Sequence, residues 1–455
     1  MATLVPNNRK ESGLPPVQKK ISFIQMAVIP INEASGAPAK EQKKISAWFA
    51  LANLLKTMVG PGCFSLPLAF KQSGWVAALT IIVVQCYLSI VTMSKLVKCS
   101  NHIARNEKCG PLNYGRMAGK STERSWRPIS KFSMIAEFIV NLSIIALQLG
   151  ICCVAYIFVV YQTHELLHLV LNEVPDRHAL FPMCLPAFLI IGSITCLHFQ
   201  SVVSIVGNGV MLIAAVTVLW QLLMADHQPL SSLPMVGGFT GIVTAAGAVL
   251  YALEGQAMIL PLENRMKKPS EMKGLFGVIN LGVSITGALF VGVGFLGFLA
   301  FGQGVEDSIT LNLSNSPVSA FAKALLLIGV FSSFVVQLMP VVSMIWPSIK
   351  VKLVEREWSS RKCLVSQIVF RMFLTLVIFT AAVLIPKLED MIPLIGMTSA
   401  MMLAFTFPSL FHFLLFAPLF SQSQSKVRHF FDLLLDVFCF SLGIFFMIAG
   451  VSAKL

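Results

Sequence analysis

The chain has 455 residues, of which 56% are hydrophobic and 12% are charged, and its formal net charge is +13. Charged residues make up about twice that share of a soluble domain, so this composition excludes an ordinary soluble protein and predicts an all-α membrane protein. The basic residues are spread over many loops, without a basic domain interleaved with aromatic residues, and this pattern argues against nucleic acid as a partner.

The amino-terminal part, residues 1–47, is polar and contains seven Lys and Arg residues. Its longest apolar stretch, residues 21–31, is too short to cross a bilayer, and no signal peptide is evident. We expect a soluble, disordered, basic tail in the cytosol, followed by one transmembrane domain over residues 48–453.

Hydropathy over windows of about 20 residues predicts eleven transmembrane helices. Their expected ranges are 48–71, 75–98, 132–162, 183–200, 202–224, 238–261, 274–301, 317–349, 363–385, 390–418 and 429–453.

Lys and Arg are concentrated in alternate loops. With the amino terminus in the cytosol, loops 99–131, 262–273, 350–362 and 419–428 carry seven, four, five and two basic residues, whereas the opposite loops contain only Arg177 and Lys387. The positive-inside rule therefore favours a cytosolic amino terminus. The cytosolic basic residues also make anionic membrane lipid an expected partner, although topology alone accounts for such a pattern.

The first predicted span is interrupted by Gly60-Pro61-Gly62. Pro61 has no backbone N–H and glycine favours non-helical angles, so the helix is expected to break here. Lipid cannot satisfy the freed backbone groups, and the break must face protein, water or a ligand.

A second interruption occurs five spans later, where Glu254-Gly255-Gln256 follows an apolar run. Glu254 is the only carboxylate deep in a predicted span, at a cost of roughly 2.5–3.5 kcal/mol. Burial disfavours its charged form, so Glu254 is a candidate to take up and release a proton. The alternative is a permanently protonated side chain that braces the unwound turn.

Two broken helices at the middle of a membrane expose amide groups to an anion and carbonyl groups to a cation. A zwitterionic amino acid carries both charges. We expect its carboxylate near the amides of residues 60–64 and its ammonium near the carbonyls around Leu253.

Five motifs carry a resemblance to a known family. They read NLLKTMVGPGCFSLPLAFKQSGW, QLGICCVAY, EGQAMILPLENRMKKP, GFLAFGQGVEDSITLNL and LIPKLEDMIPLIG. Together they resemble the proton-coupled amino acid transporter branch of the amino acid/auxin permease family, over about residues 46–420.

The resemblance implies a leucine-transporter-like fold with a five-plus-five inverted repeat, whose first and sixth helices are broken. It also implies cation-coupled uptake of small neutral amino acids, with a proton as the expected coupling ion and sodium not excluded. Because the sequence has no cysteine pairs at zinc-ligand spacing and no GxSxG motif, we expect no metal site, no cofactor and no enzymatic activity. The expected substrate-binding residues are Val59, Gly60, Pro61, Gly62, Cys63, Phe64, Tyr156, Tyr251, Leu253, Glu254 and Gly255, with Glu254 also as the proton-coupling residue.

Three departures from the family leave an alternative function open. Met58 and Pro61 stand where many members have polar residues, no histidine occurs in the second span near Val91, and Ser316 stands near one expected cysteine. The lost polar groups and the long basic tail also fit an amino-acid-sensing receptor that moves little solute. The family disulfide is not expected here.

Two short patterns bear on the cellular context. Asn312-Leu313-Ser314 has the form of a glycosylation acceptor, and residues 114–117, Tyr-Gly-Arg-Met, have the form of a tyrosine sorting signal. The sequence leaves open the plasma membrane or a lysosomal or endosomal membrane, and it leaves protein partners unknown.

Overall fold

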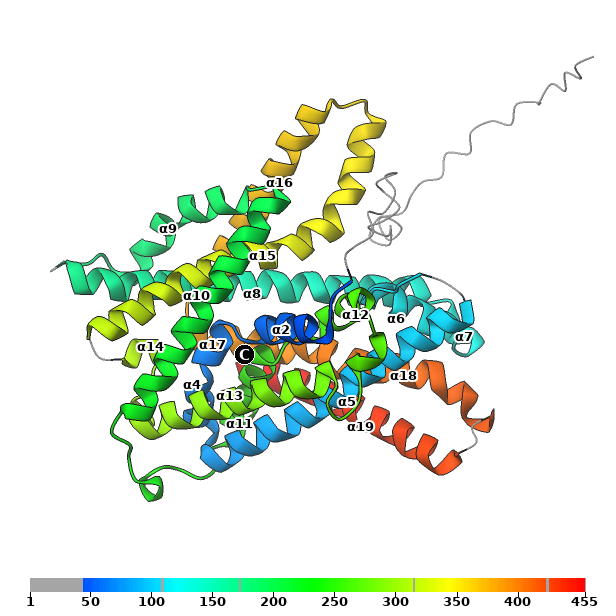
Figure 1. Ribbon diagram of the computed structural model, residues 1–455, viewed down its shortest axis with the longest axis horizontal. Helices are drawn as coiled ribbons and strands as arrows, with labels where there is room; N and C mark the ends of the chain where they lie inside the picture. Colours follow the sequence, from blue (N-terminus) through cyan, green and yellow to red (C-terminus); the bar gives the residue numbers. More distant parts are fainter. Residues whose placement is uncertain (1–43, 108–109, 172, 314–315, 423–424, 455) are drawn as a thin grey trace, which may run out of the picture.

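A computed structural model describes residues 44–107, 110–171, 173–313, 316–422 and 425–454. The described residues are almost entirely helical and contain no sheet (Figure 1). The predicted tail lies almost wholly outside them, so its conformation stays a prediction. The helices in the first half of the chain are α2 (Ala47–Met58), α3 (Pro61–Phe64), α4 (Leu66–Ser73), α5 (Trp75–Glu107), α6 (Tyr114–Glu123), α7 (Arg127–Ser130), α8 (Ser133–Val170), α9 (Arg177–Gly192) and α10 (Leu197–Met224).

The second half continues this arrangement after a short 3-10 turn, η1 (Leu230–Ser232). Its elements are α11 (Phe239–Ala252), α12 (Gln256–Arg265), η2 (Pro269–Met272), α13 (Val278–Phe301), η3 (Gly302–Gly304), α14 (Ile309–Asn312), α15 (Pro317–Glu355), α16 (Ser360–Leu384), α17 (Leu388–Ile395), η4 (Gly396–Ala400), η5 (Met402–Thr406), α18 (Phe407–Phe416), η6 (Ala417–Gln422) and α19 (Lys426–Lys454). The η4 and η5 segments are π-helical and continue α17 into α18.

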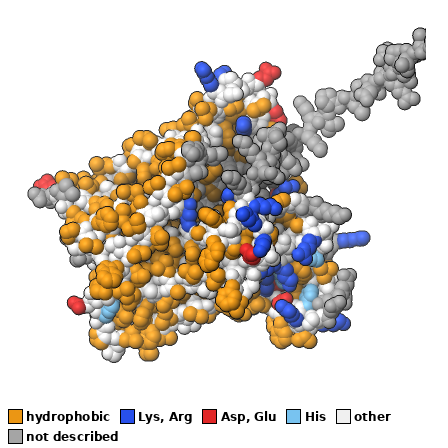
Figure 2. Space-filling model, viewed as in Figure 1, with side chains coloured by type: hydrophobic (Ala, Val, Ile, Leu, Met, Phe, Trp, Pro, Cys, Tyr) orange, Lys and Arg blue, Asp and Glu red, His pale blue; other side chains and the backbone are white. Residues whose placement is uncertain are grey.

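Nine helices among the described residues are long and apolar enough to cross a membrane. The other two expected spans correspond to α2–α4, which is broken, and to α9, which has 16 residues. The total of eleven spans requires both to cross and stays a prediction, as does the inverted repeat. Figure 2 shows an apolar surface over most of the visible face, with Lys and Arg gathered at one end.

The helices form two packed groups. The long helices α8 and α15 pack along each other, with α10 against α15 and α16 against α8. The second group places α4 against α11 and α13, with α5 beside α13 (Figure 1). Small residues permit the close α10–α15 crossing, since a methyl group on Gly329 would lie 3.3 Å from the Gly207 carbonyl oxygen.

The boundary between the predicted fourth and fifth spans was placed wrongly. The break lies at residues 193–196, so the expected boundary near residue 200 falls inside α10. Arg371 of α16 donates to the carbonyls of Gly192, at 3.4 Å, and Ile194, at 2.9 Å. A side chain distant in sequence thus satisfies the carbonyl groups that the break exposes, and the local sequence gives no sign of it.

A backbone bridge joins the entry of the first broken helix to the exit of the sixth. The N–H of Ile45 donates to the Arg265 carbonyl, and the N–H of Lys267 donates to the Ile45 carbonyl, both at 2.8 Å. This isolated parallel bridge pairs Ile45 with Met266. It holds the start of α2 beside the end of α12.

A buried charged cluster attaches α19 to the rest of the fold. The Asp436 carboxylate lies 2.6 Å from Lys95 Nζ of α5 and 2.6 Å from His412 Nδ1 of α18. All three side chains are almost fully enclosed. The two partners of the Asp436 carboxylate offset the free-energy cost of burying these charges away from water. An unpaired charge inside the membrane would bear this cost in full.

We predict that Asp436→Asn destabilises the fold by about 3–5 kcal/mol, because it leaves Lys95 buried without a counter-charge. The matched control is Asp432→Asn on the same helix, whose partner Lys98 is half-exposed at 3.5 Å. That change is expected to cost about 0–1 kcal/mol. Thermal unfolding of both variants in detergent measures the difference, and equal shifts of the midpoint would contradict the prediction.

Candidate functional site

The first break separates α2 from α3. After Met58 the chain leaves the helical conformation, with Val59 at φ −88°, ψ 98° and Gly60 at φ −142°, ψ −164°. Pro61 then begins α3, and the Cys63 N–H closes its first turn on the Gly60 carbonyl at 3.0 Å. Pro61 has no N–H to continue the bonding of α2, so the helix ends where the sequence predicts.

The second break separates α11 from α12. Helix α11 ends at Ala252, Gly255 takes φ −157° and ψ −2°, and α12 begins at Gln256. The N–H of Glu254 donates to the Tyr251 carbonyl at 3.3 Å, which closes a short turn before α12 begins. The predicted interruption of the sixth span is therefore present in the structure.

The two breaks lie side by side. A methyl group on Gly62 would come within 2.8 Å of the Tyr251 ring and 3.2 Å of the Ala252 Cα atom. Across the other junction, a methyl group on Gly255 would lie 3.1 Å from the Met58 side chain. Glycine at both places allows α2–α3 and α11–α12 to approach at backbone distance.

A cavity of about 480 Å³ adjoins both breaks, and helices α8, α10 and α15 with the start of α6 provide its other walls. Seven of the predicted site residues line it, namely Val59, Gly60, Pro61, Gly62, Tyr251, Glu254 and Gly255. The other four predicted residues, Cys63, Phe64, Tyr156 and Leu253, are buried and are not part of the lining. The Tyr156 hydroxyl donates instead to the Phe181 carbonyl at 2.6 Å, which directs it toward α9.

Glu254 is enclosed and faces the start of α12. The side chain is 7% exposed, and neither carboxylate oxygen completes a hydrogen bond within the described part of the chain. The backbone N–H groups of Gln256 and Ala257, at the start of α12, are close enough to interact with the carboxylate. A buried carboxyl group without a full set of partners requires either a proton or a ligand that donates to it.

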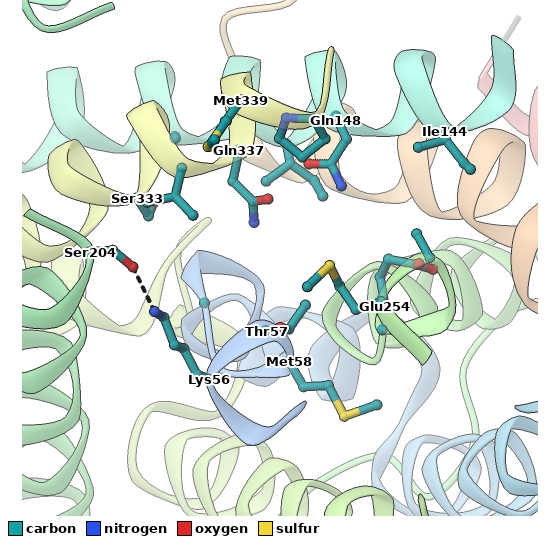
Figure 3. A pocket seen from close by; sticks show the side chains of 18 of the residues that line it. Lys56, Thr57, Met58, Ile144, Gln148, Ser204, Glu254, Ser333, Gln337 and Met339 are labelled. Carbon is teal, nitrogen blue, oxygen red and sulfur yellow. Dashed lines mark hydrogen bonds between the residues drawn. The ribbon is translucent and has the colours of Figure 1, made fainter. Parts of the chain in front are cut away.

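The prediction from sequence missed the polar side chains that α8 and α15 contribute. Asn141 and Gln148 of α8, with Ser333 and Gln337 of α15, line the cavity. Figure 3 shows Gln148, Ser333 and Gln337 on the side opposite the first break. Gln148 is 6% exposed and its Oε1 atom has no donor among the described residues. The α8 residues that line the cavity, at positions 141, 144, 148, 151 and 155, have the spacing of one helical face. Asn141 and Gln148, two amides seven residues apart on that face of a mostly apolar helix, were the available signal.

Lys56 was also missed, and it is the only cationic residue in the lining of this cavity. Its ammonium donates to the Ser204 hydroxyl of α10 at 2.6 Å and forms no ion pair with a carboxylate of the described residues. Figure 3 shows Lys56 and Glu254 at opposite ends of the cavity. One charged group of each sign thus faces the same space without a counter-charge.

Comparison with known sequences gives matches over nearly the whole chain. A model of the family described as "Transmembrane amino acid transporter protein" matches residues 43–455. "Probable amino acid transporter skat-1" of Caenorhabditis elegans is 30% identical over 431 residues, which cover 92% of this chain and 91% of that protein. "Amino acid transporter AVT3B" of Arabidopsis thaliana is 28% identical over 425 residues, covering 90% and 93%.

Among solved structures, the chain is similar to Mhp1, described as a nucleobase-cation-symport-1 family transporter in a closed conformation. The TM-score is 0.52 at 12% sequence identity, with 93% of this chain and 95% of that chain covered. A similarity at this identity concerns the fold alone. It assigns the chain to the leucine-transporter-like architecture, in agreement with the two observed helix breaks.

Two glycine substitutions test whether Gly62 is packed against the sixth span while Gly60 faces open space in the cavity. Gly62→Ala is expected to destabilise the fold by about 1–3 kcal/mol, because its methyl group meets the Ala252 backbone, which has little room to yield. Gly60→Ala is expected to change stability by no more than about 0.5 kcal/mol. Its backbone is extended and a methyl group there meets nothing within 4 Å. Thermal unfolding in detergent distinguishes the two, and a larger loss for Gly60→Ala would refute the placement.

Proposed function

Because the chain belongs to the amino acid/auxin permease family of transmembrane amino acid transporters, we propose that it is a secondary active transporter that moves small neutral amino acids together with protons. The observation that carries this proposal is the meeting of two broken helices at one cavity, beside a single buried carboxyl group, Glu254. Family members are transporters, and an enzymatic function is not proposed.

The substrate occupies the cavity as a zwitterion. Its carboxylate is held by backbone amides at the break that contains Gly60 and Gly62, and its ammonium by carbonyls near Leu253 and by acceptors such as Gln148 Oε1. Lys56, one helical turn before the first break, adds positive charge on the side of the carboxylate. This charge also disfavours amino acids with cationic side chains, which would meet an ammonium without compensation.

Glu254 carries the coupling proton in this proposal. A proton from the acidic side neutralises the carboxylate and lowers the cost of closing a dry site around the substrate. When the cavity opens to the cytosol, the proton leaves and the carboxylate is again charged. Transport should therefore be faster when the side opposite the basic loops is acidic.

The proposed topology places the amino terminus and the basic loops in the cytosol. The plasma membrane and lysosomal or endosomal membranes are the proposed locations. Asn312 is the proposed glycosylation site on the opposite side, where its side chain donates to the Gly304 carbonyl at 2.8 Å. Ser314 of this acceptor pattern lies outside the described residues.

The test is uptake of labelled amino acids into vesicles reconstituted with the full chain, with pH and sodium gradients imposed separately. We expect accumulation of alanine or glycine under a pH gradient, with weak competition by lysine or arginine. Accumulation driven only by sodium would refute proton coupling. Specific binding of an amino acid without accumulation under any gradient would favour the sensing receptor instead.

Glu254→Gln is expected to abolish accumulation driven by a pH gradient while exchange of internal for external substrate continues. Glutamine retains the shape and hydrogen bonds of the side chain but cannot titrate. Uptake and exchange measured in the same vesicles provide the comparison. Unchanged accumulation with unchanged pH dependence would make Glu254 a structural brace.

Lys56→Met is expected to raise the KM for alanine about tenfold, which corresponds to the loss of one charge-assisted hydrogen bond of about 1.5 kcal/mol. Inhibition by alaninamide, which lacks a carboxylate, should be unaffected. Ser204→Ala keeps the ammonium and serves as the control, with a smaller expected change. Equal effects of Lys56→Met on alanine and alaninamide would show that Lys56 does not hold the carboxylate.

A further inference from the structure

A second hollow lies away from the cavity at the helix breaks, where α5 meets the start of α19. Its volume is about 280 Å³, and it is lined by Lys98, Ser425, Arg428, His429 and Asp432. Three of these five side chains are basic. The hollow belongs to the end of the molecule where Figure 2 shows Lys and Arg gathered.

Contacts from neighbouring helices hold two of the basic groups in place. Lys98 Nζ lies 4.7 Å from the centre of the Phe416 ring and 3.5 Å from the Asp432 carboxylate. The Nε2–H of His429 donates to the Phe416 carbonyl at 3.0 Å, since a carbonyl can only accept. Phe416, at the end of α18, therefore positions a lysine and a histidine on the same rim.

The charge of the hollow is not balanced from within. Asp432 is the only carboxylate in its lining, and its pair with Lys98 is half-exposed, so the interaction is weak. Arg428 is exposed and forms no ion pair with a described residue. The lining thus keeps a net positive charge, which favours an anion.

Apolar side chains surround this charge on the same helix. On the first turns of α19, Val427 is 70% exposed, Phe431 61%, Phe430 54% and Leu434 52%. A soluble anion would make no contact with these apolar side chains. A phospholipid can contact both, because its phosphate is joined to acyl chains. A basic group next to exposed aromatic and aliphatic residues is the pattern expected where a helix enters the lipid headgroup region.

We propose that this hollow binds the phosphate headgroup of an anionic membrane lipid. Arg428 and Lys98 contact the phosphate, His429 lies at the rim, and the acyl chains follow the apolar side chains of α19. The site is independent of the transport cavity, so the proposal does not rest on the transported substrate.

The experiment titrates phosphatidylinositol 4-phosphate onto the full chain in detergent and counts bound lipid by native mass spectrometry. Arg428→Ala should weaken binding about fivefold, as expected for the loss of one cation near a lipid phosphate. Asp432→Asn should strengthen binding by about the same factor, because it removes the opposing carboxylate and releases Lys98. Changes of opposite sign at Arg428 and the half-exposed Asp432 cannot arise from a general loss of folding.

Arg127→Ala is the matched control, an exposed arginine on α7 that belongs to the basic loops but not to the hollow. It should leave binding unchanged. Equal weakening by Arg127→Ala and Arg428→Ala would overturn the proposal in favour of diffuse attraction between charges. A second arm uses inositol 1,4-bisphosphate, which has no acyl chains, and binding as tight as that of the lipid would overturn the assignment to a lipid.

Discussion

The structure depends on one constraint: backbone polar groups inside a membrane require partners from the protein itself or from what the protein encloses. Most described helices satisfy it within their own turns. The chain departs from this at residues 59–60 and 253–255, where two helices stop and restart. Both departures lie against each other and against the cavity, so the exposed groups face protein and ligand space instead of lipid.

Two buried polar groups elsewhere in the described chain differ from those at the cavity in their hydrogen-bond partners. Asp436 has two partners, and Arg371 satisfies the carbonyls that the α9–α10 break exposes. Around the cavity, Glu254 and Gln148 retain acceptor atoms that no donor among the described residues bonds. A group with its partners stabilises the fold, whereas a group left open toward a cavity is available to something that enters it. Buried atoms without partners also occur away from the cavity in the described chain, for example Gln85 Oε1 and Gln162 Oε1, so the position beside the cavity is what makes Glu254 and Gln148 functional candidates.

Local signals in the sequence predicted the breaks well, because Gly60, Pro61 and Gly255 act through their own backbone chemistry. The helical class and the membrane location followed from composition in the same way. Tyr156 lies outside the lining of the cavity, and its direction depends on the Phe181 carbonyl of another helix, which the sequence does not reveal. Lys56 and Gln148 were missed because only tertiary packing turns their helix faces toward the breaks. The break after Gly192 was predicted too late in the chain for the same reason, because the Arg371 side chain that bonds the Gly192 carbonyl is 179 positions away on α16.

The bridge between Ile45 and the residues after α12 consists entirely of main-chain hydrogen bonds. Side chains at these positions can therefore vary without altering it, while an insertion or deletion of one residue shifts its register. The number of residues between the bridge and each break therefore sets how the two broken helices align, and the type of residue at the bridge does not. Sequence divergence among related chains would leave this alignment intact as long as the spacing between Ile45 and the first glycine is kept.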